Sequence, residues 1–303
     1  MQKCYKLDGG RLLPCEEADA DVVVVISPDA TQKNLLIQSH QIDEHTFNSA
    51  LDSDELARIE YEDDYTGIIF KKPKSYTADD HFQFKVGSFG VFIYEDMVVI
   101  LSDSDIPLVD ERRFSKMGSL KVFVLRLLNY SIYHFTEHLK IINRISDEIE
   151  TKIESSMKNE YLIYMFSLGK GLTYYLNAIN SNDMLLRRLQ SSRSLAFDET
   201  ERDLLDDLMI ENQQCLRQAE IYSNILANMT GARASIVSNN LNILMKTLNI
   251  LTVGIMVPTF VVSAFSMNVP IPMSDFKGAF IIIMGLAALS VAGFMWFYKK
   301  RGW

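Results

Sequence analysis

The C-terminal part of the chain, 246–303, contains two long stretches without a formal charge, and these stretches restrict the possible folds more than any other feature. One runs from Thr247 to Ser274 and the other from Gly278 to Tyr298. A helix of about 20 residues crosses the hydrocarbon core of a bilayer, and helices buried in soluble proteins rarely run that long without a charge. We therefore predict a transmembrane hairpin, which covers 245–303 with spans at about 247–267 and 278–298.

Basic residues flank the two predicted spans and indicate their orientation. Lys246 precedes the first span, and Lys299, Lys300 and Arg301 follow the second. Positive residues close to a span stay on the cytoplasmic side. We expect a multi-pass protein of the cell's inner or plasma membrane, with its N- and C-termini in the cytoplasm. The N-terminal sequence, MQKCYKLDGG, lacks the apolar segment of a secretory leader, so no targeting segment is expected.

Acidic residues are concentrated in the region that precedes the spans. Residues 1–115 carry 23 acidic against 11 basic residues, whereas residues 246–303 carry 1 against 5. An acidic surface repels the phosphates of nucleic acids and attracts cations. We expect cations and the lipid bilayer as partners, and no nucleic acid.

The chain up to residue 118 is predicted to form an acidic α/β cytoplasmic domain. Short apolar runs at 21–27, 65–70, 89–94 and 97–101 are separated by acidic or Gly/Pro turns, which is typical of β-strands. Between the first two runs, residues 52–59 are predicted to form a short helix.

Residues 119–244 are predicted to form a helical stalk domain. Apolar residues recur at helical spacing from Leu120 to Ile149, and a second helical stretch covers about 160–191. A third helix is predicted at about 199–265, because acidic residues mark its start and no proline occurs before Pro258. This helix would be roughly 100 Å long and therefore needs support from other helices or from copies of itself. The predicted fold class is α+β with a membrane part: an α/β domain, a long-helix stalk funnel and two transmembrane helices per subunit.

A polar seam follows one face of the first predicted span. Its members are separated by alternating steps of three and four residues, which keeps them on one face of a gently supercoiled helix. Uncharged oxygen-bearing side chains alternating with Met suit the lining of a narrow water path, and they equally suit hydrogen bonds between packed helices. The seam consists of Asn242, Met245, Asn249, Thr252, Met256, Thr259 and Ser263.

A short motif ends the first predicted span. Ser266, Met267 and Asn268 follow a span that begins after the run MKTL at 245–248 and contains Pro258. A short loop, the second span and a basic C-terminus come next. In this order of features, which extends over most of the chain, the sequence resembles the CorA family of divalent-cation channels and transporters. The acidic run IEYEDDY at 59–65 is similar to a segment that precedes a central strand in that family.

The resemblance implies a homopentamer that conducts hydrated Mg²⁺ passively. In the family a Gly-Met-Asn signature closes the first span, so Ser266, Met267 and Asn268 would form the ion-selectivity site here. Mg²⁺ loses water reluctantly, and amide oxygens can bind its hydration shell instead of the ion itself. Together with the seam, the resemblance indicates pore-lining side chains at Asn242, Asn249, Thr252, Thr259 and Ser263. It indicates a hydrophobic gate at Met245, Leu248 and Met256.

The resemblance also implies regulation by cytoplasmic Mg²⁺ bound between subunits. Asp206 and Asp207 lie on the predicted third helix, and the separation in sequence between Asp207 and Asn268 is similar to that of the family. Such weak sites need only one or two carboxylates plus water. The two residues equally suit a solvated acidic helix face, and the partner acid stays open among Asp63, Asp64, Asp79, Asp80 and Glu95.

Three features depart from the family pattern: Ser266 replaces the signature Gly, Pro258 lies one position late, and the outer loop carries a single acid, Asp275. Two alternatives therefore stay open beside the Mg²⁺ channel, for which Co²⁺ and Ni²⁺ are further candidate ions. One is a Zn²⁺ transporter of the ZntB type, and the other is a non-conducting sensor or scaffold with the same fold.

No motif in the sequence indicates an enzyme. Gly87 and Gly90 lack the spacing of a phosphate-binding loop, and Tyr174 stands where a dinucleotide motif starting at Gly169 needs its third Gly. His134 and His138 have the i, i+4 spacing of a metal pair, but no third ligand lies nearby in sequence, which favours a packing or surface role.

Overall fold

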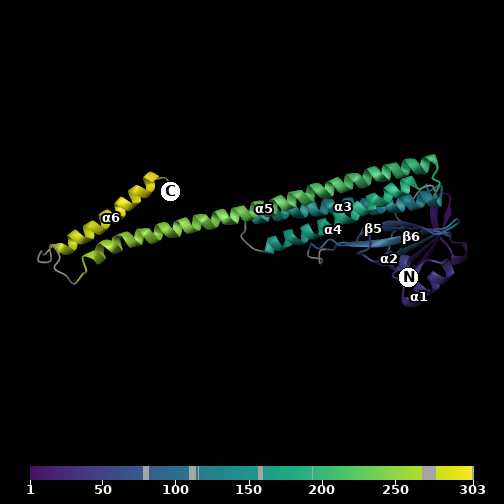
Figure 1. The fold of residues 1–303 in the computed structure, drawn as a ribbon, viewed down its shortest axis with the longest axis horizontal. Coiled ribbons are helices and arrows are strands. Elements are labelled where there is room, and N and C mark those ends of the chain that lie inside the picture. Colours follow the sequence, from purple (N-terminus) through teal and green to yellow (C-terminus); the bar gives the residue numbers. More distant parts are fainter. Residues whose placement is uncertain are drawn as a thin grey trace. The chain divides into compact units, whose positions relative to one another are not determined.

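The computed structural model describes residues 1–77, 82–108, 114, 116–155, 160–192, 194–267 and 278–301. The chain divides into two compact units, Met1–Thr230 and Gly231–Trp303. Figure 1 shows the elements of each unit. Helix α5 (Glu199–Ala264) belongs to both units, because its first part packs in the first unit and its last part in the second.

A mixed seven-stranded sheet with the order β2-β1-β3-β7-β6-β5-β4 forms the centre of the first unit. Strands β3 and β7 pair in parallel, and all other neighbouring strands are antiparallel. A single turn of 3-10 helix, Glu17–Asp19, precedes β3. The strands are β1 (Gln2–Asp8), β2 (Arg11–Pro14), β3 (Val22–Ile26), β4 (Arg58–Tyr61), β5 (Thr66–Pro73), β6 (Val86–Ile93) and β7 (Val98–Ser102).

The central strands of this sheet are buried on both faces, which explains why the sequence of β3 is a continuous apolar run. Val22 and Val24 belong to the hydrophobic cluster that includes the long helices, whereas Val23 and Val25 belong to the cluster on the opposite face. Successive side chains of a strand point to opposite faces, so a strand covered on both sides needs apolar residues at every position. The layers are helix, sheet and helix: α1 (Ala30–His40) and α2 (Glu44–Leu51) on one face, α3 (Leu120–Ser155), α4 (Glu160–Ser191) and α5 on the other.

The predicted helix at 52–59 is wrong. The helix of this region, α2, lies earlier, at Glu44–Leu51, and Asp43 caps it by accepting a hydrogen bond from the Thr46 backbone at 2.9 Å. Strand β4 begins at Arg58 and pairs antiparallel with β5. Pairing with a buried strand therefore outweighs the local helical pattern.

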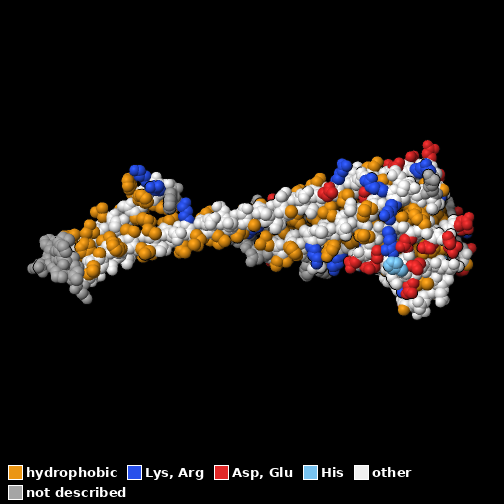
Figure 2. All heavy atoms as spheres, in the orientation of Figure 1, with side chains coloured by type: hydrophobic (Ala, Val, Ile, Leu, Met, Phe, Trp, Pro, Cys, Tyr) orange, Lys and Arg blue, Asp and Glu red, His pale blue; other side chains and the backbone are white. Residues whose placement is uncertain are grey.

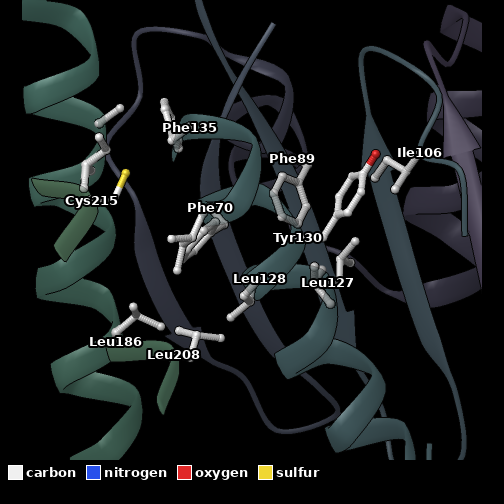
Figure 3. Packing of buried hydrophobic residues seen from close by; sticks show 14 of the residues in the cluster. Phe70, Phe89, Ile106, Leu127, Leu128, Tyr130, Phe135, Leu186, Leu208 and Cys215 are labelled. Atoms are coloured by element: carbon white, nitrogen blue, oxygen red, sulfur yellow. The ribbon is translucent and has the colours of Figure 1, made fainter. Parts of the chain in front are cut away.

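The three long helices agree with the periodicity of the sequence, since α4 covers the predicted 160–191 and α5 ends one residue before the predicted 265. Figure 3 shows how they close the core: Phe70 and Phe89 of the sheet face Leu128 and Phe135 of α3. Cys215 of α5 and Leu226, near the end of the first unit, belong to the same cluster. The sheet and the first half of the stalk thus share one hydrophobic core.

The second unit contains the last part of α5 and helix α6 (Ala279–Arg301). Both helices are long and apolar enough to cross a membrane. Figure 2 shows hydrophobic side chains over both of them, with Lys and Arg at the C-terminal end of α6.

Candidate functional site

The seam predicted from the sequence is a continuous exposed face of α5. All seven of its side chains are exposed in the single chain, from Asn242 through Thr252 to Ser263. A helix of this apolar character would be expected to bury its polar positions if they served contacts within the chain. The seam is therefore available for water or for other copies of the protein.

Helix α6 packs on the other side of α5. The half-buried residues of this part of α5 include Gly254, Pro258 and Val261, each two positions after a seam residue. Two residues correspond to about 200° around a helix, so this stripe lies nearly opposite the seam. A β-carbon placed on Gly254 would lie 3.7 Å from Cε1 of Phe294, which identifies α6 as the neighbour of the stripe.

The seam threonines hold their hydroxyl hydrogens within their own helix. Thr252 donates to the carbonyl oxygen of Leu248 at 2.8 Å, and Thr259 donates to that of Ile255 at 2.7 Å. A hydroxyl that has donated its hydrogen keeps its lone pairs as acceptors. The seam thus presents acceptor oxygens, which match the outward-pointing hydrogens of water around a cation.

The predicted gate residues are exposed apolar side chains. Met245, Leu248 and Met256 are each more than half exposed in the single chain. Large apolar side chains that converge from several copies of a helix can close a narrow path by expelling its water.

The predicted selectivity motif is described in part. The Ser266 hydroxyl donates to the carbonyl oxygen of Ser263 at 2.9 Å, and Met267 is exposed. Ser266 is not among the described non-glycine residues with positive φ, so its β-carbon imposes no left-handed strain where the family has Gly. Asn268 lies outside the described residues.

The sequence reasoning missed that the seam continues toward the stalk. Gly231, Ser235 and Ser238 precede Asn242 at the same alternating spacing, and all three are exposed. The signal was present, because the steps of three and four residues continue without interruption. A polar face therefore extends beyond the predicted span.

The candidate regulatory acids lie on the exposed side of α5. Asp206 and Asp207 are both exposed, and Asp206 accepts a hydrogen bond from the side-chain amide of Gln190 at 2.6 Å. Asp63, Asp64 and Glu95 are also exposed, whereas Asp79 and Asp80 lie outside the described residues. Within the described part of one chain, no group of three or more His, Cys, Asp or Glu side chains could hold a metal ion.

The histidine pair of α3 has a packing environment. Nδ1 of His138 lies 2.7 Å from the hydroxyl of Tyr175, and the ring stacks on that tyrosine. Burial, followed by the charge of His134, lowers the pKa of His138 to about 4. His134 in turn lies against the ring of Tyr130. These contacts favour the packing role over metal binding.

Comparisons with known proteins agree with this architecture. The cobalt/magnesium transport protein CorA of Methanocaldococcus jannaschii is 22% identical over 265 residues, which cover 84% of this chain and 81% of that protein. The complete structure of the CorA magnesium transporter from the same organism matches with a TM-score of 0.84 at 18% identity, over 100% of this chain and 98% of the other. The structure of the full-length CmaX protein matches with a TM-score of 0.75 at 15% identity, over 100% and 97%.

These structural similarities confirm the predicted fold class, an α/β domain with a long helical stalk and two apolar C-terminal helices. The model of the CorA-like Mg2+ transporter protein family matches residues 23–300, nearly the whole chain. The chain therefore belongs to the CorA-like Mg2+ transporter family.

Proposed function

We propose that the chain is a divalent-cation transporter, not an enzyme, which forms a homopentameric channel for hydrated Mg²⁺. Each chain contributes an α/β domain (1–118), a stalk (119–244) and a transmembrane hairpin (245–303). The observation that carries this proposal is the exposed seam of α5, which from Thr252 onward lies opposite the side that contacts α6.

In a ring of identical chains, the seam of every copy would face the central axis. Closed rotational symmetry brings the same face of every copy toward one axis. Because α6 contacts α5 at Gly254, on the side opposite Thr252, Met256 and Thr259, the hairpin leaves this part of the seam free to face that axis. The cytoplasmic part of the seam borders the groove between α5 and α6 and is still exposed in the single chain. The resemblance to the CorA family supports five copies in the proposed ring.

The seam chemistry suits an ion that keeps its water. The lining oxygens of Thr252 and Thr259 act as acceptors, and the amide oxygens of Asn242 and Asn249 add further acceptors at the same face. Mg²⁺ dehydrates reluctantly, so acceptors that bind its outer water are sufficient. The seam carries no formal charge, which keeps binding weak enough for the ion to leave.

Selectivity and closure are assigned to separate levels of the pathway. Asn268, preceded by Ser266 and Met267, meets the hydrated ion at the outer mouth. Met245, Leu248 and Met256 form the hydrophobic constriction, and their exposure in the single chain supports convergence between copies.

The chain lies in the inner or plasma membrane with both termini in the cytoplasm. Lys246 and the cluster 299–301 flank the cytoplasmic ends of the two spans, which supports this orientation. Mg²⁺ then enters down its electrochemical gradient from the side of Asn268.

Cytoplasmic Mg²⁺ closes the channel by binding between neighbouring chains through Asp206, Asp207 and an acidic side chain of the next copy. Both aspartates are exposed on α5, and Asp63 and Asp64 are exposed acids of the α/β domain. A site shared between chains is consistent with the absence of a three-ligand group among the described residues of a single chain.

The test is ion influx into liposomes that contain a Mg²⁺-sensitive dye. We expect influx through the wild-type protein and its loss in Asn268→Ala. The matched control is Asn239→Ala, which removes an exposed amide of α5 outside the seam and should conduct as the wild type does. Equal influx through both variants would contradict the assignment of Asn268.

The same liposomes separate the alternatives. Added Co²⁺ and Ni²⁺ that compete with Mg²⁺ would extend the list of transported ions. Zn²⁺ uptake that depends on a pH gradient, without Mg²⁺ influx, would replace the proposal with a ZntB-like transporter. An intact oligomer that passes no divalent cation would replace it with a sensor or scaffold.

A further inference from the structure

The second unit contains a large groove beside the seam, and most of its lining residues have no part in the proposed ion path. It has a volume of about 820 Å³ and lies between the residues of α5 around Asn249 and the C-terminal turns of α6. Ile250, Val253 and Phe294 give it apolar walls. A groove of this size holds a sizeable part of an organic molecule.

Two cations line the same groove. Lys246 and Arg301 come from different helices, and each lies at the end of an uncharged stretch. The described residues of this unit, 231–267 and 278–301, contain five basic side chains and no acidic one. The charge of the two lining cations therefore has no acidic counterpart in the described part of the unit.

The combination identifies the chemistry of the occupant. The two cations favour an anionic ligand, and the apolar walls favour a ligand whose anionic group carries a hydrocarbon chain. A soluble phosphate would leave the apolar walls uncovered. Basic pockets between transmembrane helices on the cytoplasmic side recognise anionic lipid head groups.

Aromatic side chains place the groove at the level of lipid head groups. Tyr298 lines the groove, and Lys300 lies over the ring of the neighbouring Trp296 at 5.0 Å from its centroid. Trp and Tyr concentrate at the interface between membrane and water. The end of α6 thus carries the residues that a protein uses at the boundary where phosphate groups lie.

We propose that this groove is a binding site for one anionic phospholipid of the cytoplasmic leaflet, with its phosphate between Lys246 and Arg301 and an acyl chain along Val253 and Phe294. The lipid would lie beside Asn242, Met245 and Asn249, three seam residues that also line the groove. The proposal rests on the membrane orientation given above, but it does not require conduction.

The test counts lipids retained by the full-length protein. The protein is placed in nanodiscs of equal parts phosphatidylglycerol and phosphatidylcholine, released, and examined by native mass spectrometry. We expect the wild type to retain phosphatidylglycerol preferentially. Lys246→Gln combined with Arg301→Gln should lower that retention at least about tenfold, because each removed cation weakens attraction to an anionic lipid severalfold.

The matched control keeps the same net charge. Lys299→Gln combined with Lys300→Gln also removes two cations from the end of α6, but neither residue lines the groove, so retention should stay within about twofold of the wild type. Val253→Trp fills the apolar part and should lower retention with both cations in place. Gel filtration confirms that each variant is folded and of unchanged size.

Three results would overturn the proposal: equal losses in the two double variants, undiminished retention in Val253→Trp, or displacement of the lipid by excess glycerol phosphate, which lacks an acyl chain. Mg²⁺ influx measured on the same proteins keeps the two proposals apart. Lipid retention without influx contradicts the channel and supports the lipid site, whereas influx without selective retention does the reverse.

Discussion

The two units of the chain differ in how completely they bury their large apolar side chains. In the first unit Phe70, Phe123 and Phe135 are completely buried, and the core joins the sheet to three helices. In the described part of the second unit Ala287 is the one buried residue, and Phe260 is 75% exposed. The first unit therefore buries its large apolar side chains within one chain. In the described part of the second unit, nearly all such side chains stay exposed or half-buried in a single chain.

This difference indicates where the second unit obtains its stability. Burial of apolar surface stabilises a protein in proportion to the area removed from water. In the proposed channel, lipid and other copies would cover this pair of helices, which has little internal burial. The polar seam and the charged groove are the two surfaces of this unit that would bind a specific partner: the hydrated ion at the seam and an anionic lipid in the groove.

The largest expected effect tests the self-contained character of the first unit. Phe70→Ala should lower the free energy of unfolding of this unit by about 3–5 kcal/mol, because the cavity lies in the centre of the core. Phe166→Ala, which truncates a phenylalanine of α4 that is 75% exposed, should cost less than about 0.5 kcal/mol. Urea denaturation followed by tyrosine fluorescence measures both, and similar losses would break the comparison.

A pH dependence of stability should follow from the buried His138. Its pKa of about 4 in the folded chain lies below the usual value of 6.5, so between these pH values the unfolded chain binds a proton that the folded chain excludes. Stability should therefore fall as the pH drops from 6.5 toward 4, by at most about 3 kcal/mol. Urea denaturation at several pH values measures the slope, and His138→Gln should reduce it. An unchanged slope in this variant would assign the pH dependence to other groups.

A smaller effect tests how the stalk joins the sheet. The Asn182 side chain accepts from the backbone N–H of Lys71 at 2.9 Å and donates to its carbonyl oxygen at 3.0 Å, just beyond the point where β4 stops pairing with β5. Asn182→Ala leaves the buried N–H of Lys71 without this partner, whereas the carbonyl oxygen keeps its hydrogen bond from the Ser131 hydroxyl. The loss should cost about 2 kcal/mol of unfolding free energy. Asn129→Ala removes an exposed contact with Glu211 and should cost less than about 1 kcal/mol, as chemical denaturation can verify. If Asn182→Ala lost as little unfolding free energy as the control, water would replace the Asn182 amide as the hydrogen-bond partner of the Lys71 backbone.

The smallest effect is expected in the second unit. Phe294 is half-buried against α5, so Phe294→Ala should cost about 1 kcal/mol, visible as a decrease of a few degrees in the thermal midpoint in detergent. Phe280→Ala is the control, because Phe280 is 75% exposed on the same helix. A decrease as large as that of a core residue of the first unit would show that the hairpin is stable without lipid or other copies.

The long elements of the fold were predictable from the sequence. Helix α4 and helix α5 are encoded by sustained apolar periodicity and by the lack of proline before Pro258. Strands β5 and β6 are encoded by dense apolar runs. In contrast, the edge strand β2 and its neighbour β1 were missed, because both contain charged residues and their place in the sheet depends on pairing with β3. Helix α1 was missed because its 11 residues bury Leu36 alone.

Part of the candidate site was also predictable from the sequence. The spacing of the seam residues fixed their common face, since helix geometry is local. The side of α5 that packs against α6 was not predictable, because the apolar positions of α5 outside the seam suit lipid as well as α6, and α6 is too uniformly apolar to show which of its faces meets α5. The groove at Lys246 and Arg301 depends on that packing and follows only from the structure.

The central claim is that the exposed seam of α5 lines the path of a hydrated cation. The most direct test compares Thr259→Val with Thr247→Val in the liposome influx assay. Both threonines lie on α5 and donate to their own backbone, but Thr247 lies outside the seam. We predict that Thr259→Val lowers Mg²⁺ influx at least about fivefold, since an acceptor worth about 1 kcal/mol is lost, while Thr247→Val conducts as the wild type does. Equal influx through the two variants would contradict the claim.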